Sequence, residues 1–265
     1  MKWSRRPARR APTPHRSSTT SSPQRIINSL ILASVYLDQR RFAEAETLLT
    51  AALRADPEET IGMTADIDLT SAAIRQEDCV QAEKHARLAL ASARRLLPPS
   101  HPTLAIALNN LAQVCRLTGN YLEAERSYRQ ALEIWESVLG PSHPDVAHGL
   151  MNLAALCHER GREPGAEQLY RRAVAIFDQA LGPESPDALV ARSELADVLR
   201  AERRYTEAER TGGATMASLE KSLGPEGPRV WRAMVNYARP LRETRRAQEA
   251  EALLTRIHQS VTAFR

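Results

Sequence analysis

GPSHPD occupies residues 140–145, GPESPD residues 182–187 and GPEGPR residues 224–229. A related segment, PPSHPT, occupies residues 98–103, and the proline at the fifth position of each segment recurs every 42 residues. A fixed period of this size is typical of a stacked repeat array. Glycine and proline end one helix, and the later proline suits the first turn of the next helix, where its missing N–H would be unpaired. The chain is therefore predicted to repeat one helical unit.

Each position of the linker has an expected role. Gly140 is expected to close the preceding helix in the left-handed conformation, and Pro141 prevents its continuation. His101 and His143 directly precede the prolines that start helices, so they are expected to cap those helices rather than bind metal. Asp145 adds a favourable negative charge at a helix N-terminus. The linker is therefore predicted to end one helix and to start the next.

When the sequence is aligned with itself at the 42-residue period, small residues recur at equivalent positions, and each set of equivalent positions is called a column. Apolar side chains at Leu108, Leu111 and Cys115 follow helical spacing, and Gly119 interrupts the pattern before it resumes. Two columns contain only alanine: Ala112, Ala154, Ala196 and Ala238 in one, and Ala82, Ala124, Ala166, Ala208 and Ala250 in the other. We therefore expect each unit to be a pair of antiparallel helices that cross closely at these alanines.

The unit resembles a known repeat family. The residues that carry the resemblance are Leu111, Ala112, Gly119, Tyr121, Ala124, Tyr128 and Ala131, whose pattern is similar to the tetratricopeptide repeat. The 42-residue spacing, the Asn-Leu-Ala of the first helix and the Leu-Gly-Pro-x-His-Pro linker resemble the kinesin light chain subtype over residues 63–265. Residues 30–57 resemble the shorter ordinary repeat. The resemblance implies an all-α, right-handed superhelical solenoid of about six antiparallel helix pairs.

The predicted organisation is a disordered basic tail at 1–25 followed by the solenoid at 26–265. The expected units are 26–59, 63–100, 105–140, 147–182, 189–224 and 231–265. The tail contains seven basic and no acidic residues, whereas the rest of the chain is slightly acidic. Three interpretations of the tail are open: a plain solvated segment, electrostatic docking on nucleic acid or an anionic membrane, or organelle targeting.

The sequence offers no catalytic constellation. It has no phosphate-binding glycine loop, no HExxH or GxSxG motif, and no apolar run long enough for a transmembrane helix. Cys157 and His158 are adjacent, but neighbouring helical residues point about 100° apart and do not face each other. Cys79, Cys115 and Cys157 lack metal-site spacing and favour a reducing, cytoplasmic setting. We therefore expect no enzyme activity, no cofactor and no metal.

The first helix of each unit carries two polar columns that packing does not explain. In tetratricopeptide arrays these helices line a concave groove, so the resemblance implies that the columns face a ligand. The predicted peptide-binding residues are Asn109, Asn110, Asn152 and Asn236, together with the basic column Arg116, His158, Arg200 and Arg242. Asparagine both donates and accepts hydrogen bonds, which suits a peptide backbone, and arginine favours carboxylates. The alternative is that the asparagines satisfy neighbouring loops and the arginines are solvated surface.

These observations predict a scaffold that binds an acidic segment of a partner protein in its groove, with no small-molecule substrate. The alternative function is a regulatory module whose basic tail docks weakly on nucleic acid or an anionic surface while the repeats recruit a partner. Residues 25–37 are apolar nearly all round, and the last helix stays apolar up to Phe264. Either these ends pair with another chain, which predicts self-association, or the array is truncated.

Overall fold

The computed structural model describes residues 23–55 and 60–263, and within these ranges the chain forms twelve helices and no strand. The helices are α1 (Pro23–Asp38), α2 (Phe42–Ala55), α3 (Thr60–Arg75), α4 (Cys79–Leu96), α5 (Pro102–Leu117), α6 (Tyr121–Leu139), α7 (Pro144–Glu159), α8 (Glu163–Leu181), α9 (Pro186–Ala201), α10 (Tyr205–Leu223), α11 (Pro228–Glu243) and α12 (Ala247–Ala263). Helix α1 begins inside the predicted tail. The rest of that tail, residues 1–22, lies outside the described residues.

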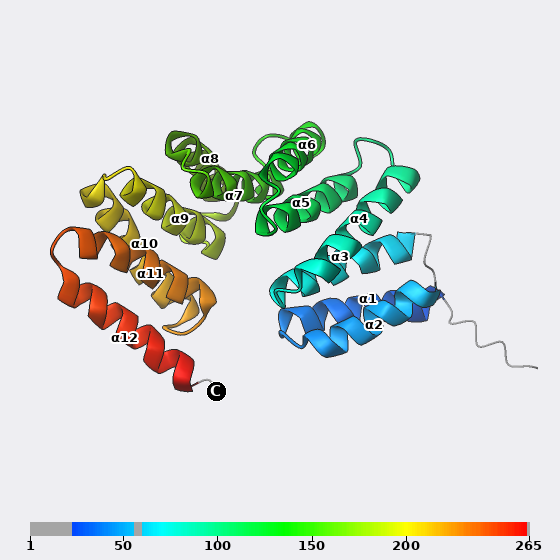
Figure 1. The fold of residues 1–265 in the computed structure, drawn as a ribbon, viewed down its shortest axis with the longest axis horizontal. Helices are drawn as coiled ribbons and strands as arrows, with labels where there is room; N and C mark the ends of the chain where they lie inside the picture. Colours follow the sequence, from blue (N-terminus) through cyan, green and yellow to red (C-terminus); the bar gives the residue numbers. More distant parts are fainter. Residues whose placement is uncertain (1–22, 56–59, 264–265) are drawn as a thin grey trace, which may run out of the picture.

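Successive helices pack as antiparallel pairs that follow one another along an arch (Figure 1). In the middle of the arch, α5 and α7 lie on the inner side and α6 and α8 on the outer side (Figure 1). Helices α1 and α2 form one end of the arch, and α11 and α12 form the other. The predicted all-helical solenoid of six helix pairs is confirmed. The first helices of the units therefore line the inner surface.

The buried core is a strip along the array. Both alanine columns lie in it, and every member is at most 1% exposed. Because alanine has the smallest helix-forming side chain, these positions let neighbouring helices approach closely. Larger buried side chains, among them Tyr128, Trp135 and Phe177, fill the space between units. Each unit thus buries its apolar face against the next, as expected for a stacked array.

The linkers fold largely as their sequence predicts. Gly140 has φ 87° and ψ 156°, so its φ is positive as predicted, but its ψ lies outside the left-handed helical region and in a region that only glycine occupies. The backbone N–H of Asp145 donates to Nδ1 of His143 at 3.2 Å, and that of Thr103 donates to Nδ1 of His101 at 3.2 Å. The predicted capping roles of both histidines are confirmed.

The last linker departs from this pattern. Gly227 is the N-cap of α11 and offers no side chain to the first turn, whereas Ser185 caps α9 through its hydroxyl. Gly227 also has φ 136°, a conformation that side chains with a Cβ rarely adopt. The first-turn amides of α11 therefore have no side-chain partner within this linker.

A glycine pair inside α10 is matched by a tyrosine from the next unit. Gly212 occupies the position that Tyr128 and Tyr170 occupy in the two preceding units. A Cβ on Gly213 would lie 3.2 Å from the Tyr237 ring, and one on Gly212 would lie 3.4 Å from it. The ring of Tyr237 thus packs over the two glycines. Each glycine lowers the stability of the helix by about 1 kcal/mol relative to alanine.

The two ends of the array differ. Helix α1 exposes Ile27, Ile31, Leu32 and Val35, at 41–60%. On α12, Leu253 is buried, and the side chains of Val261 and Phe264 lie outside the described residues. The predicted apolar surface is thus present at the first end, and self-association stays a prediction. None of the described helices combines the length and the apolar character that crossing a membrane requires.

Candidate functional site

The predicted site residues lie on α5, α7, α9 and α11, the first helices of four consecutive units. Asn110, Asn152 and Asn236 hold equivalent positions on three of these helices, and Glu194 holds that position on α9. The basic column begins six residues later, near the C-terminal end of each helix, where a cation is favoured by the helix dipole. Both columns therefore run across the units rather than along one helix.

The asparagine column is partly used by the array itself. Asn152 donates from Nδ2 to Oδ1 of Asn109 on the preceding unit at 2.9 Å. Asn236, which is only 4% exposed, donates to the carbonyl oxygen and the hydroxyl of Ser193 at 3.2 and 3.1 Å. These amides connect consecutive first helices. The Asn110 side chain is half-buried and makes no hydrogen bond with any residue of the described ranges 23–55 and 60–263.

The basic column is largely ion-paired. Arg116 donates to Glu159, on the first helix of the next unit, and its side chain is 18% exposed. His158 lies between Glu163, at 2.5 Å from Nδ1, and Asp197, at 3.4 Å from Nε2. Glu159 and Asp197 thus hold these cations from the next unit, and Glu163 holds His158 from within its own unit.

Asp197 is the centre of a cluster that joins three units. Its oxygens accept from Nε of Arg200 at 2.7 Å and from Nη1 of Arg239 at 2.6 Å, and His158 lies beside them. Burial alone would raise the pKa of Asp197, but the hydrogen bonds from His158 and Arg200 lower it to about 2. The hydrogen bond with Asp197 raises the pKa of His158 to about 9, against the effect of burial. His158 is therefore protonated at neutral pH.

Asp197 and Arg239 were missed by sequence reasoning. Their shared column holds Gln113, Ala155, Asp197 and Arg239 in successive units, so no residue type repeats there. The sequence feature that could have indicated this pair is an acidic residue, Asp197, followed one repeat period later by a basic residue, Arg239. Arg242, the last member of the predicted basic column, is exposed and makes no ion pair with the described residues.

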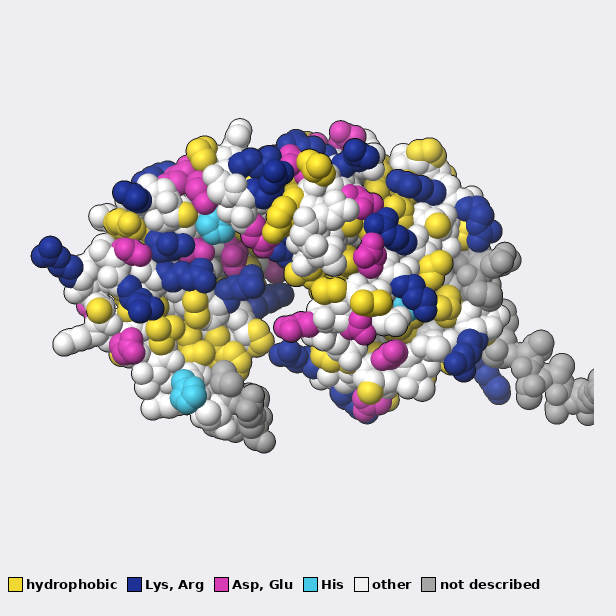
Figure 2. Space-filling view, viewed as in Figure 1, with side chains coloured by type: hydrophobic (Ala, Val, Ile, Leu, Met, Phe, Trp, Pro, Cys, Tyr) yellow, Lys and Arg dark blue, Asp and Glu magenta, His cyan; other side chains and the backbone are white. Residues whose placement is uncertain are grey.

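A cavity of about 270 Å³ opens between α9 and α11. Val190, Ser193 and Glu194 line it from α9, and Arg232 and the start of α11 line it from the other side. Arg232 is 67% exposed and pairs with Glu194 at 3.2 Å. Figure 2 shows Lys and Arg side chains gathered over these helices beside the hollow of the arch. The inner surface is therefore recessed and carries accessible positive charge here.

Cys115 and Cys157 have the properties of core residues. Cys115 and Cys157 are 2% and 5% exposed, and burial raises the pKa of both thiols, that of Cys115 to about 12. A nucleophilic cysteine needs a lowered pKa and access to substrate. In the part of the chain that the structure describes, no group of three or more His, Cys, Asp or Glu side chains could hold a metal ion. Neither observation supports catalytic chemistry at these residues.

Two tetratricopeptide repeat models match the sequence, one at residues 63–136 and 103–179 and the other at residues 30–63. The matches together extend from residue 30 to residue 179 of the 265-residue chain, and the helix pairs continue at the same period to its end. The chain belongs to the tetratricopeptide repeat family. A tetratricopeptide repeat array is typically a scaffold for protein interactions. No curated protein matches the sequence.

Solved structures share the fold of this tetratricopeptide repeat protein at low sequence identity. The TPR-like repeats of a protein assigned as kinesin light chain from Podosopora anserina are 23% identical, with a TM-score of 0.61 over 77% of this chain and 96% of that one. BtubC (BKLC) from P. vanneervenii is 20% identical, with a TM-score of 0.64 over 90% and 92%. PilW, a type IV pilus biogenesis factor, is 17% identical, with a TM-score of 0.65 over 90% and 94%. The structural neighbours thus include kinesin light chain-like repeat proteins.

Proposed function

We propose that this tetratricopeptide repeat protein is a non-enzymatic scaffold that binds an extended acidic segment of a partner protein along its inner surface. The observation that carries the proposal is the accessible positive charge of α11. Arg229, Arg232 and Arg239 pair with acids of α9, yet their side chains remain 48–67% exposed. The exposed pairs of Arg229 with Asp187 and of Arg232 with Glu194 contribute only about 0–1 kcal/mol each, so carboxylates of a partner compete for these two arginines. Arg242 has no acid partner among the described residues and is open to a ligand.

The predicted site residues divide into two groups under this proposal. Asn110 and Arg242 have side chains that bind nothing else in the described chain, so they are the members assigned to the partner. Asn152 bonds to Asn109 on the preceding unit, and Arg200 bonds to Asp197 on its own helix, so both are already engaged within the array and position the inner surface. Asn110 suits the backbone of an extended segment because its amide offers both a donor and an acceptor.

The proposal is tested with fluorescein-labelled extended peptides in which Glu alternates with Ser. Binding is followed by fluorescence polarisation, and the same peptides with Gln in place of Glu measure the charge contribution. Replacing both free residues, Asn110→Ala with Arg242→Ala, should weaken binding of the acidic peptides by about tenfold while leaving the unfolding midpoint in urea unchanged. Raising the salt concentration should weaken binding of the acidic peptides more than that of the Gln peptides.

The matched control is the double variant Asn152→Ala with Arg200→Ala. Because each of these side chains bonds within the array, this variant should lower the free energy of unfolding by about 1–2 kcal/mol. Equal binding of Glu and Gln peptides by the wild-type protein would contradict the acidic preference. The alternative function depends on the basic tail, most of which lies outside the described residues, and no described contact favours it.

A further inference from the structure

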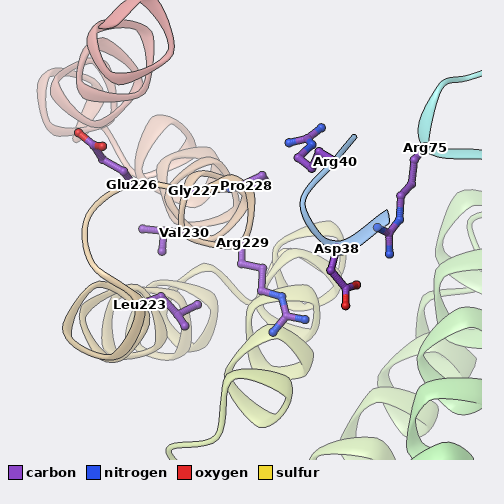
Figure 3. Close-up of a pocket in the computed structure, with 9 residues that line it drawn as sticks. All are labelled: Asp38, Arg40, Arg75, Leu223, Glu226, Gly227, Pro228, Arg229 and Val230. Atoms are coloured by element: carbon purple, nitrogen blue, oxygen red, sulfur yellow. The ribbon is translucent and has the colours of Figure 1, made fainter. Parts of the chain in front are cut away.

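A second cavity lies where the two ends of the arch approach each other. It has a volume of about 530 Å³ and is lined from one side by Asp38, Arg40 and Arg75. The other side is the connection between α10 and α11, residues 223–230. These two walls are about 150 to 190 residues apart in the sequence and come from opposite ends of the array (Figure 3). The cavity therefore exists only because the arch curves back on itself.

Basic side chains dominate the inside of this cavity. Arg40, Arg75 and Arg229 line it with two acidic residues, Asp38 and Glu226. Figure 3 shows that the Glu226 carboxylate points away from the opposite wall, whereas Arg229 extends toward Asp38 across the gap. Three arginines from three different elements thus line a cavity into which one carboxylate, that of Asp38, points. Such a cavity attracts an anion.

The three arginines are available to a ligand to different degrees. The Arg40 side chain makes no hydrogen bond or ion pair with the described residues. Arg229 has a single pair, with Asp187 at 3.5 Å, and is 55% exposed. Arg75 donates from Nη1 to the Leu37 carbonyl oxygen at 2.9 Å, which fixes its position at the end of α1. The Arg75 guanidinium is therefore held in place, that of Arg40 has no partner among the described residues, and that of Arg229 has one long, exposed ion pair to exchange for a ligand.

The wall formed by the α10–α11 connection also offers apolar surface. Leu223, which is 42% exposed, and Pro228 line the cavity beside Arg229. The uncapped first turn of α11, at Gly227, opens on the same side and adds partial positive charge. The chemistry of this wall suits a molecule that has both an apolar body and a negatively charged oxygen group.

We propose that this cavity binds a small organic anion, with a carboxylate or phosphate held by Arg40, Arg75 and Arg229 and an apolar body against Leu223 and Pro228. Its volume lies in the range of small-molecule sites, about 300–1,000 Å³. The ligand contacts the first two units and the α10–α11 connection at once. It therefore binds only the curved form of the array and favours that form when present. The site adjoins the partner surface described above and shares Pro228 and Arg229 with it, whereas Arg40, Arg75 and Leu223 belong to this cavity and not to the one between α9 and α11.

The proposal is tested by isothermal titration calorimetry on the full chain. The probes are phenyl phosphate and 4-phenylbutyrate, which distinguish the two anionic groups, and inorganic phosphate, which lacks an apolar body. At least one organic probe should bind saturably, and inorganic phosphate should bind at least about tenfold more weakly. Weak, non-saturating heats with both organic probes, or equal binding of inorganic phosphate, would overturn the proposed ligand chemistry.

Two variants locate the binding site. Arg40→Gly removes one guanidinium at a residue whose φ is 59°, so glycine relieves the backbone there and the fold is retained. Arg229→Gln removes a guanidinium from the opposite wall. Each should weaken probe binding by about tenfold, whereas the control Arg256→Gln, an exposed arginine paired only with Glu220, should not change it. Loss of binding in only one of the two variants would show that the ligand does not bridge the ends.

A distance measurement tests the bridging directly. Spin labels at Gln39→Cys and Lys221→Cys, in a Cys79→Ser background, report the separation of the two walls. Saturating probe should narrow the distance distribution in the labelled protein and leave it unchanged when Arg229→Gln is added. If the probe binds saturably but leaves the distance distribution unchanged in the labelled protein that retains Arg229, the ligand does not favour the curved form of the array.

Discussion

The central units and the last two units build the same interface in different ways. In the centre, Tyr128 and Tyr170 from second helices pack in clusters with leucines of the following first helices, Leu153 and Leu195. At the equivalent interface between α10 and α11, the tyrosine is exchanged to the other side, with Gly212 on the second helix facing Tyr237 on the following first helix. The comparison teaches that a tyrosine ring can fill this interface from either of the two helices.

A transplant of the C-terminal arrangement into the centre gives the strongest test of this comparison. Tyr128→Gly alone should lower the free energy of unfolding by about 4 kcal/mol, because it leaves a cavity and adds a glycine to a helix. Adding Leu153→Tyr should recover about half of that loss by filling the cavity. Urea denaturation of the two variants measures both values. No recovery in the double variant would show that the exchange depends on features particular to α10 and α11.

The two regions also differ in their electrostatics, because Asp197 concentrates three cations near the C-terminal interface. Asp197→Asn should destabilise the protein by about 2 kcal/mol, since the carboxylate is buried and its loss leaves His158, Arg200 and Arg239 facing one another. The control is Asp187→Asn, whose more exposed carboxylate pairs with Arg229 at 3.5 Å and should contribute about 0.5 kcal/mol or less. An equal loss of unfolding free energy in the two variants would show that Asp197 stabilises the protein no more than the exposed Asp187 does.

The smallest effect expected is a dependence of stability on pH. His158 has a pKa of about 9 in the folded protein, above the ordinary value of about 6.5. Protonated His158 therefore stabilises the fold fully below about pH 6.5, and this stabilisation is lost as the pH rises through 9. After allowance for solvent screening, the free energy of unfolding should fall by about 1 kcal/mol between these limits. The wild type is compared with His158→Gln in urea denaturation at both pH values. The same fall in His158→Gln would assign the effect to another group.

The fold followed from the sequence because its signals repeat. The linker prolines, the histidine caps and the alanine columns each act within a few residues, and the structure shows them where the period places them. The exchange at Gly212 was not predictable in this way. Its partner, Tyr237, lies on the following unit, and the sequence alone showed only the cost of a glycine inside a helix.

The site was less accessible to sequence reasoning than the fold. The asparagine column was visible in the sequence as a repeated polar feature, but periodicity gives no information on hydrogen-bond partners. Asn152 and Asn236 bond to the preceding unit through residues that are themselves different, Asn109 and Ser193. In the Asp197 cluster, His158 and Arg200 belong to the predicted basic column, but Asp197 and Arg239 meet them only once in the described array, so no column marks these two residues.

The strip-like core has a mechanical consequence. A globule with a central core resists bending as a single body, whereas here the curvature of the whole molecule is the accumulated tilt at five successive junctions between helix pairs. A small rotation at each junction adds up to a large displacement at the tips. The molecule should therefore behave as a spring whose tips move farthest for a given load, with its softest motion being the widening and narrowing of the arch.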